Sequence, residues 1–348
     1  MGRFNRFNRY FSYSRQFLKG LLLLSLLSMS AAQATEKRDL IIDTDPGADD
    51  VVALLLALAS PQELNVLAIT TVAGNVRLDK TSRNARLARE WAGREDVPVY
   101  AGAPKPLVRS PIYAENIHGK EGLPGVTVHE PKQGLANGNA VQYLIDTLSK
   151  AKPHSITIAM LGPETNLALA LVQAPEITQG IKDVVVMGGA HFNGGNITPV
   201  AEFNIFADPQ AAQVVLASGV KLTYIPLDVT HKILTSLQRL SQIAGLHNQA
   251  GKLVSDILNA YVTADMQHYD LPGGPVHDAS VIAWLLKPEL FSGKQIHVDI
   301  DSREGIGFGQ TVADWYDTLH QNKNVFWVEN GDAQGFFDLL TARLARLK

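Results

Sequence analysis

Short apolar runs rich in β-branched residues recur along the whole chain. Most of them are continuously apolar rather than alternating, which favours strands buried on both faces of a parallel sheet. The predicted strands are 39–43, 65–72, 97–102, 155–161, 183–189, 221–228, 295–300 and 324–329.

Segments with helical periodicity lie between many of these runs. The predicted helices are 49–59, 79–92, 137–150, 164–173, 208–218, 250–268, 278–286 and 332–346. Alternating strands and helices predict an α/β fold with a doubly wound, mostly parallel sheet flanked by helices. Ligands of such sheets bind beyond the carboxyl ends of the strands, so the segments that follow the strands are the candidate site.

The first 34 residues differ from the rest of the chain. They carry five basic residues and no acidic one, then an apolar stretch, then "AQA" at 32–34. This order is typical of a signal peptide with an A-x-A cleavage site, and the apolar stretch is short for a transmembrane helix. We expect residues 1–34 to be removed on export, with a retained N-terminal anchor as the alternative. Residues 35–348 are then one domain, in the periplasm and without stable membrane insertion.

Composition narrows the function classes. The chain has 348 residues, of which 46% are hydrophobic and 19% charged, as in a globular enzyme with a sizeable core. It has no cysteine, which excludes disulfides and thiolate metal sites. Removing the five basic residues of the N-terminal segment takes the formal charge from −3 to −8. An acidic chain without a dense Lys/Arg cluster argues against nucleic acid as a partner.

The stretch "DTDPGADD" places Asp43, Asp45, Asp49 and Asp50 where the first predicted strand meets the first predicted helix. Helix capping explains one or two of these acids, but crowded like charges repel and raise one another's pKa. A divalent cation would neutralise them, and all-oxygen ligation indicates Ca²⁺ or Mg²⁺. An aspartyl-phosphate nucleophile also follows a strand as D-x-D, but the D-P-G-x-D-D continuation does not suit that loop.

Other strand ends are polar too, and their residues allow simpler interpretations. Each asparagine at these ends can be a turn or capping residue. Glu202 and Asn204 flank Phe203 and share one side if the segment is extended. Asp278 can cap the helix predicted after it, and His277 can be a surface residue. The glycines of "MGGAHFNGGN" lack the spacing of a phosphate-binding loop, so we take them as allowing close backbone approach to a ligand.

Taken together and in order, these motifs resemble one known family. The motifs are "DTDPGADD" (43–50), "AITTVAGN" (68–75), "IHGKEGLPG" (117–125), "LGPETNLALAL" (161–171), "MGGAHFNGGNITPVAEFNIFADPQAA" (187–212), "PLDVTH" (226–231) and "VHDASVIAWLLKPELF" (276–291). The chain resembles the inosine-uridine preferring nucleoside hydrolases from about residue 39 to about residue 340. Two departures from the family stand at Glu164, where an apolar residue is common, and at Ala279, where proline is common.

The resemblance implies a Ca²⁺ centre. Its carboxylate ligands would be Asp45, Asp50 and Asp278, joined by the main-chain carbonyl of Thr165. The hydroxyls of the ribose and one water would complete the shell around the ion. Asp45 would also be the base that deprotonates this water.

The resemblance also assigns residues to the substrate. The implied ribose-binding residues are Asp49, Asn75, Asn196, Glu202 and Asn204. His277 would face the base and help it leave, and an imidazolium can supply the proton near neutral pH. His118 matches a histidine on a mobile loop over the base. Members of the family are commonly homodimers or homotetramers.

The expected activity is therefore Ca²⁺-dependent hydrolysis of the N-glycosidic bond of ribonucleosides, which yields ribose and a free purine or pyrimidine base. One alternative is a non-catalytic periplasmic protein that binds nucleosides or sugars. Another is hydrolysis of a different N-riboside, such as nicotinamide riboside, by the same residues.

Overall fold

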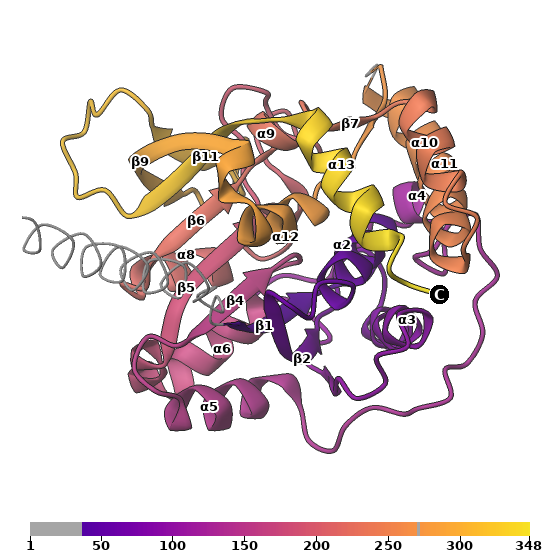
Figure 1. Cartoon of the computed structure of the whole chain (residues 1–348). Coiled ribbons are helices and arrows are strands. Elements are labelled where there is room, and N and C mark those ends of the chain that lie inside the picture. Colours follow the sequence, from indigo (N-terminus) through magenta and orange to yellow (C-terminus); the bar gives the residue numbers. More distant parts are fainter. Residues whose placement is uncertain (1–36, 270–271) are drawn as a thin grey trace, which may run out of the picture. The chain divides into compact units, whose positions relative to one another are not determined.

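The computed structural model describes residues 37–269 and 272–348, and Lys37–Lys348 forms one compact unit (Figure 1). The predicted signal peptide, 1–34, lies outside the described residues. Within the described part of the chain, no helix is both long and apolar enough to cross a membrane.

A nine-stranded sheet runs through the unit in the order β10-β9-β11-β6-β5-β4-β1-β2-β3. Its strands are β1 (Arg38–Thr44), β2 (Leu64–Thr71), β3 (Val99–Ala101), β4 (Ile156–Met160), β5 (Ile181–Met187), β6 (Leu222–Ile225), β9 (Phe291–Ile300), β10 (Thr311–Asp314) and β11 (Val325–Gly331). The seven strands from β11 to β3 are parallel, whereas β9 and β10 add antiparallel to one edge. A separate small pair is formed by β7 (Leu234–Thr235) and β8 (Gly274–Pro275).

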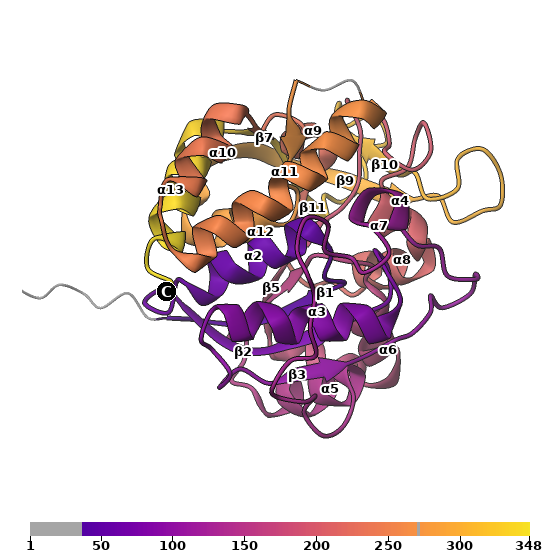
Figure 2. The ribbon, with the colours of Figure 1, turned by 90° about the vertical axis from the view of Figure 1, so that its right-hand side faces the viewer.

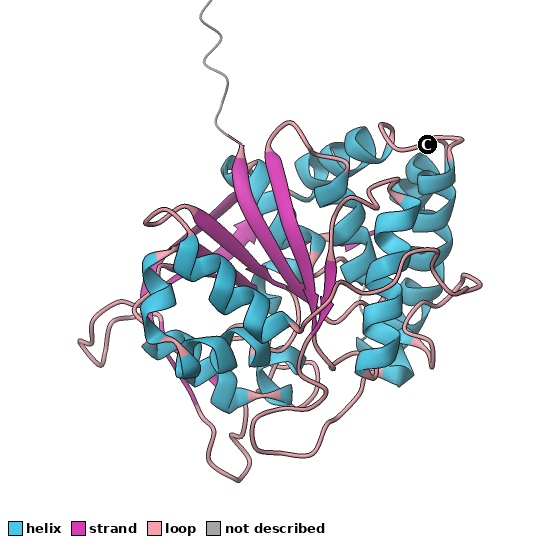
Figure 3. Ribbon diagram, turned by 90° about the horizontal axis from the view of Figure 1, so that it is seen from below, coloured by secondary structure: helices cyan, strands magenta, loops and turns pink. Residues whose placement is uncertain are grey.

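Helices cover both faces of the sheet, as Figures 2 and 3 show. The first face carries α2 (Ala48–Leu58), α3 (Leu78–Trp91), α10 (Leu237–Ala244), α11 (Gln249–Tyr269), α12 (Ala279–Leu286) and α13 (Ala333–Leu344). The other face carries α5 (Ala140–Lys150), α6 (Thr165–Gln173), η1 (Pro175–Gln179) and α8 (Pro209–Ala217). Short turns of helix are α4 (Glu115–His118), α7 (Phe203–Ala207), α9 (Leu227–Thr230) and η2 (Pro288–Leu290).

The central strand β1 explains why its sequence is continuously apolar. Leu40 and Ile42 pack into the hydrophobic cluster around α2, whereas Ile41 packs into the opposite cluster with α6. All three side chains are fully buried. Burial of each such side chain contributes about 1.5–3 kcal/mol, so a polar residue at any of the three would be costly.

The predicted doubly wound, mostly parallel sheet is confirmed, and each predicted strand and helix corresponds to an observed element. One local prediction is wrong, and one condition is not met. The strand predicted at 221–228 ends at Ile225, because Pro226 interrupts it and α9 begins at Leu227. The segment around Phe203 is not extended, because α7 begins there.

Candidate active site

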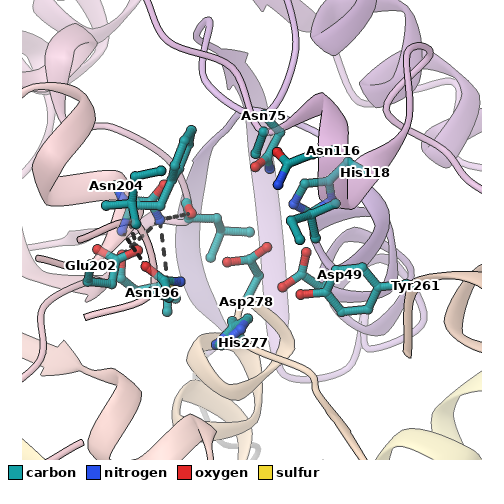
Figure 4. A pocket seen from close by; sticks show the side chains of 16 residues that line it. Asp49, Asn75, Asn116, His118, Asn196, Glu202, Asn204, Tyr261, His277 and Asp278 are labelled. Atoms are coloured by element: carbon teal, nitrogen blue, oxygen red, sulfur yellow. Dashed lines mark hydrogen bonds between the residues drawn. The ribbon is translucent and has the colours of Figure 1, made fainter. Parts of the chain in front are cut away.

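A cavity of about 230 Å³ lies beyond the carboxyl ends of the parallel strands (Figure 4). Its lining residues are Asp49, Asn75, Ala114, Asn116, Ile117, His118, Leu161, Met187, Asn196, Ile197, Glu202, Phe203, Asn204, Tyr261, His277 and Asp278. The structure thus brings every predicted substrate-binding residue to one cavity, together with His277 and Asp278. Asp45 and Asp50 do not line the cavity and are fully buried.

Asp50 is held by groups from three segments at the start of α2. Its Oδ1 accepts from the hydroxyl of Thr44 at 2.5 Å, and its Oδ2 accepts from the backbone N–H of Gly47 at 2.9 Å. The amide nitrogen of Asn75 also donates to Oδ2, at 2.8 Å. The bond from Gly47 is a capping interaction, as a helix N-terminus requires, but capping alone does not account for the neighbouring acids.

Asp45 lies in a narrow space between two glycines. Its Oδ2 accepts from the backbone N–H of Asn75 at 2.6 Å, while its Oδ1 has no hydrogen-bond partner among the described residues. A Cβ atom at Gly74 would lie 2.1 Å from Oδ2, and one at Gly162 would lie 2.3 Å from Oδ1. The loops after β2 and β4 must therefore carry glycine here for the carboxyl group to fit.

The acids form a cluster that can hold a metal ion. Asp49, Asp50 and Asp278 each offer a carboxylate oxygen, and these oxygens lie within 4.8 Å of one another. Burial raises the pKa of Asp45 and of Asp278 well above the usual range, and the charges of the neighbouring aspartates raise both further.

A cation fits this set of residues for two further reasons. None of the described residues that line the cavity is Lys or Arg, so no side-chain cation balances the acids. The unpartnered Oδ1 of Asp45 is a buried acceptor, which is costly unless something binds it. Asp45, Asp49, Asp50 and Asp278 are the residues that would hold the ion, and their all-oxygen chemistry suits a hard divalent cation.

The ligand role of the Thr165 carbonyl stays a prediction, because Thr165 is not among the residues that line the cavity. Thr165 is the first residue of α6, its hydroxyl donates to Asp208 at 2.7 Å, and it lines a small depression separate from the cavity. The residue after β4 that lines the cavity is Leu161, and its carbonyl oxygen accepts from the amide nitrogen of Asn204 at 2.7 Å.

Glu202 organises one wall of the cavity from the N-cap of α7. Its Oε1 accepts from the N–H of Asn204 at 2.8 Å, and its Oε2 accepts from the N–H groups of Gly189 and Ile205. Burial raises the pKa of Glu202 to about 7 despite these bonds. The cap, rather than an extended strand, is what places Glu202 and Asn204 on the same wall.

Each asparagine of the cavity uses one end of its side-chain amide in a hydrogen bond within the protein. Asn204 donates to the carbonyl oxygens of Leu161 and Met187, so its amide oxygen is the end that can accept from a ligand. Asn75 likewise donates to Asp50 and to the main chain of Asp45. The oxygen of Asn196 accepts from the N–H of Phe203 at 2.8 Å, as Figure 4 indicates.

Two histidines line the cavity, His118 from the end of α4 and His277 from the segment just before α12. Nδ1 of His118 accepts from the N–H of Ala48 at 3.1 Å, so Nε2 carries the proton, and Tyr261 stacks on the ring at 5.4 Å. Burial lowers the pKa of His118 to about 3. Nδ1 of His277 is 2.8 Å from the hydroxyl of Thr230. Burial, with the charges of two other histidines, lowers the pKa of His277 well below its usual range.

These shifts favour the neutral form of both rings. Each can act as an N–H donor rather than as a strong acid. Tyr261 and the pair Asn116 and Ile117 were not among the predicted site residues. In the sequence, Asn116 and Ile117 are marked only by their position next to His118. Tyr261 is marked only by its place on a predicted helix late in the chain.

Comparison with known proteins decides the family. Residues 40–338 match the family model described as inosine-uridine preferring nucleoside hydrolase. The chain belongs to this family. It is therefore a ribonucleoside hydrolase, an enzyme that splits the N-glycosidic bond of its substrate, rather than a binding protein without activity.

Individual relatives cover almost the same part of the chain. An uncharacterised protein of Schizosaccharomyces pombe is 44% identical over 308 residues, which are 88% of this chain and 99% of that one. The pyrimidine-specific ribonucleoside hydrolase RihA of Citrobacter koseri is 41% identical, over 88% of this chain and 97% of its own. Among solved structures, a purine-preferring ribonucleoside hydrolase from Gardnerella vaginalis matches with a TM-score of 0.82 and 31% identity, covering 88% and 98% of the two chains.

Proposed function

We propose that this nucleoside hydrolase uses Ca²⁺, and that Asp45 is the base that accepts the proton of the attacking water. The observation that carries the proposal is the unpartnered, buried Oδ1 of Asp45 beside the carboxylates of Asp50 and Asp278. Ca²⁺ would hold the ribose diol and polarise the attacking water, which is the chemistry that such oxygen-rich sites supply.

The other steps of the reaction would be carried out by side chains of the cavity and its surroundings. The water oxygen bonds to the anomeric carbon while the C–N bond breaks, and the water's proton passes to Asp45. Positive charge develops on the sugar, as in other glycoside hydrolyses, and the carboxylates of Asp49 and Glu202 stabilise it. The amide oxygens of Asn75 and Asn204 accept from ribose hydroxyls and orient the ring.

The departing base takes electron density from the broken bond and needs a donor. His118 and His277 face the cavity, and the proton of His118 is on Nε2 because Nδ1 is already an acceptor. A neutral N–H aimed at a carbonyl oxygen of the base stabilises its negative charge. With the RihA relatives at 41% identity, this donor supports a preference for pyrimidine nucleosides.

Export is part of the same proposal. The basic and apolar segment 1–34 with its "AQA" site supports cleavage and a periplasmic enzyme that salvages external nucleosides. We further propose a homodimer or homotetramer. Size-exclusion chromatography with light scattering measures the assembly, and N-terminal sequencing of the secreted protein measures the cleavage site.

The deciding experiment is ribose release by residues 35–348. Uridine, cytidine, inosine, adenosine and nicotinamide riboside are each assayed with Ca²⁺, with EDTA, and with EDTA followed by Ca²⁺ or Mg²⁺. We expect uridine and cytidine to be hydrolysed fastest, with loss in EDTA and recovery with Ca²⁺. Activity that survives EDTA, or returns only with Mg²⁺, rejects Ca²⁺. Purine rates above the pyrimidine rates reject the base preference.

A further inference from the structure

The loop 188–201 carries Asn196 and Ile197 to the cavity although it has no regular secondary structure. Phe192 and Ile197 are exposed large hydrophobic residues, so these two side chains add little buried surface to hold the loop in place. Hydrogen bonds also fix its conformation, and one buried side chain accepts three of those at its beginning.

That side chain is Asp228 of α9, which does not line the cavity. One carboxyl oxygen accepts from three successive backbone N–H groups, those of His191 at 3.2 Å, Phe192 at 2.8 Å and Asn193 at 3.0 Å. The other oxygen accepts from the indole nitrogen of Trp327 at 3.0 Å. Asp228 is 1% exposed, so water does not replace these bonds.

Further bonds connect this anchor to the sugar-binding wall. The N–H of Leu227, next to Asp228, donates to the carbonyl of Gly189, and the N–H of Gly189 donates to Glu202. Beyond the anchor, Asn196 accepts from the N–H of Phe203. The loop is thus attached at 189–193 by α9 and at 196 by α7, and both attachments border the residues expected to contact ribose.

We propose that Asp228 is a positioning residue for sugar binding, which rests on the proposed function of the cavity. Four donors converge on its two oxygens, and an ionised carboxylate is the group that accepts from all of them. By fixing residues 191–193 it keeps Asn196 in the conformation that binds substrate. A loop that samples this conformation only part of the time binds more weakly in proportion to that fraction.

The test is Asp228→Asn, which keeps the shape but turns an NH₂ group toward N–H donors. We expect KM for the best nucleoside to rise about tenfold while kcat changes less than about twofold, since a loop populated at about a tenth in its competent form lowers apparent affinity by that factor. Asp314→Asn is the matched control. Asp314 is also buried and accepts from two backbone N–H groups, those of Thr318 and Leu319, but it does not border the cavity. It should lower stability without changing KM.

The same substitution is repeated in an Asn196→Ala background. If Asp228 acts through Asn196, its effect on KM is largely lost there, whereas an effect of equal size in both backgrounds overturns the proposal. An unchanged KM for Asp228→Asn overturns it as well. If Asp228→Asn does not fold, Trp327→Phe removes a single donor to Asp228 and should give a smaller rise in KM.

A measurement without turnover separates this proposal from the proposed function. Amide hydrogen exchange at 191–193 should be faster in Asp228→Asn than in wild type, and calorimetry should show weaker binding of D-ribose. If wild type released no ribose from any nucleoside, the proposed function would fail. D-ribose binding and amide exchange would then test the positioning role alone: changes in both would support it, and no change in either would reject it.

Discussion

Nδ1 of His118 accepts a hydrogen bond from the backbone N–H of Ala48, in the first turn of the helix that carries Asp49 and Asp50. This bond joins the His118 side of the cavity to the cluster of aspartates. It also requires a glycine beside it, because a Cβ atom at Gly47 would lie 2.5 Å from Nδ1. The same contact therefore places His118, the proposed donor to the base, and the helix whose aspartates would hold the cation.

Protonation of His118 would break this contact, which gives a pH prediction. The pKa of His118 is about 3 in the folded chain, against 6.5 for an ordinary histidine. Below pH 6.5 the unfolded state binds the proton first, so stability is lost as pH falls toward 3, by about 1.4 kcal/mol per pH unit. His118→Gln cannot titrate and should lack this slope. Urea unfolding of both proteins at pH 7 and pH 5 in EDTA measures the difference, and parallel slopes would contradict the assignment.

Asp45→Asn tests the proton acceptor. An amide cannot accept the proton of the attacking water, so kcat should fall by about 10²–10⁴. In EDTA the variant should unfold at a higher temperature than wild type, because one of several mutually repelling buried acids has been removed. The assay is ribose release with scanning calorimetry of the same samples. Retention of full activity would remove Asp45 from the mechanism.

Gly162→Ala tests the space around Asp45 rather than its chemistry. The added Cβ would lie 2.3 Å from Oδ1 and must displace the carboxyl group. We expect kcat to fall at least tenfold, because displacing a catalytic group by 1 Å lowers the rate on the order of 10²-fold. Cation affinity should fall as well, measured by calorimetric titration. Gly134→Ala is the control, because nothing lies within 4 Å of its Cβ position.

Glu164 gives a stability prediction of the opposite sign to that of His118. The hydroxyl of Tyr224 donates to its Oε1 at 3.0 Å, and its Oε2 has no partner among the described residues. Burial raises the pKa of Glu164 to about 8. The folded state therefore keeps a proton that the unfolded state releases above about pH 4.5, and stability is lost as pH rises from there to 8.

Glu164→Gln carries no proton to lose and should be more stable than wild type at pH 8, by about 1–4 kcal/mol. Its advantage should shrink toward pH 4.5, where both side chains are neutral in both states. Urea unfolding across this range measures it. Ribose release should stay unchanged because Glu164 does not line the cavity. An advantage that does not vary with pH would mean that Glu164 is ionised in the folded protein.

The sequence predicted the long elements and the cluster of aspartates because both depend on local patterns. Leu40, Ile41 and Ile42 are apolar since both faces of β1 are covered, and the pattern of burial is visible in the sequence itself. The four-residue strand β10 gave no such signal. It lies at the edge of the sheet, pairs with β9 alone, and Val312 within it is exposed.

Two properties of the site could not be predicted from the sequence: which residue of a loop lines the cavity, and how completely a side chain is buried. Leu161 lines the cavity at the end of β4, whereas Thr165 begins α6 four residues later, and its ligand role stays a prediction. The protonation of His277 depends on how completely neighbouring elements bury it. Neither property follows from residue identity, because both are set by contacts between segments far apart in the chain.

The acids that would hold the cation come from opposite ends of the chain. Asp49 and Asp50 begin α2 directly after the first strand, whereas Asp278 precedes α12. A nascent or truncated chain that stops before residue 278 can build much of the sheet and still lacks one side of the cluster. A cation bound by this cluster would therefore join the first and the last third of the chain, and removing it would loosen the contact between α2 and α12.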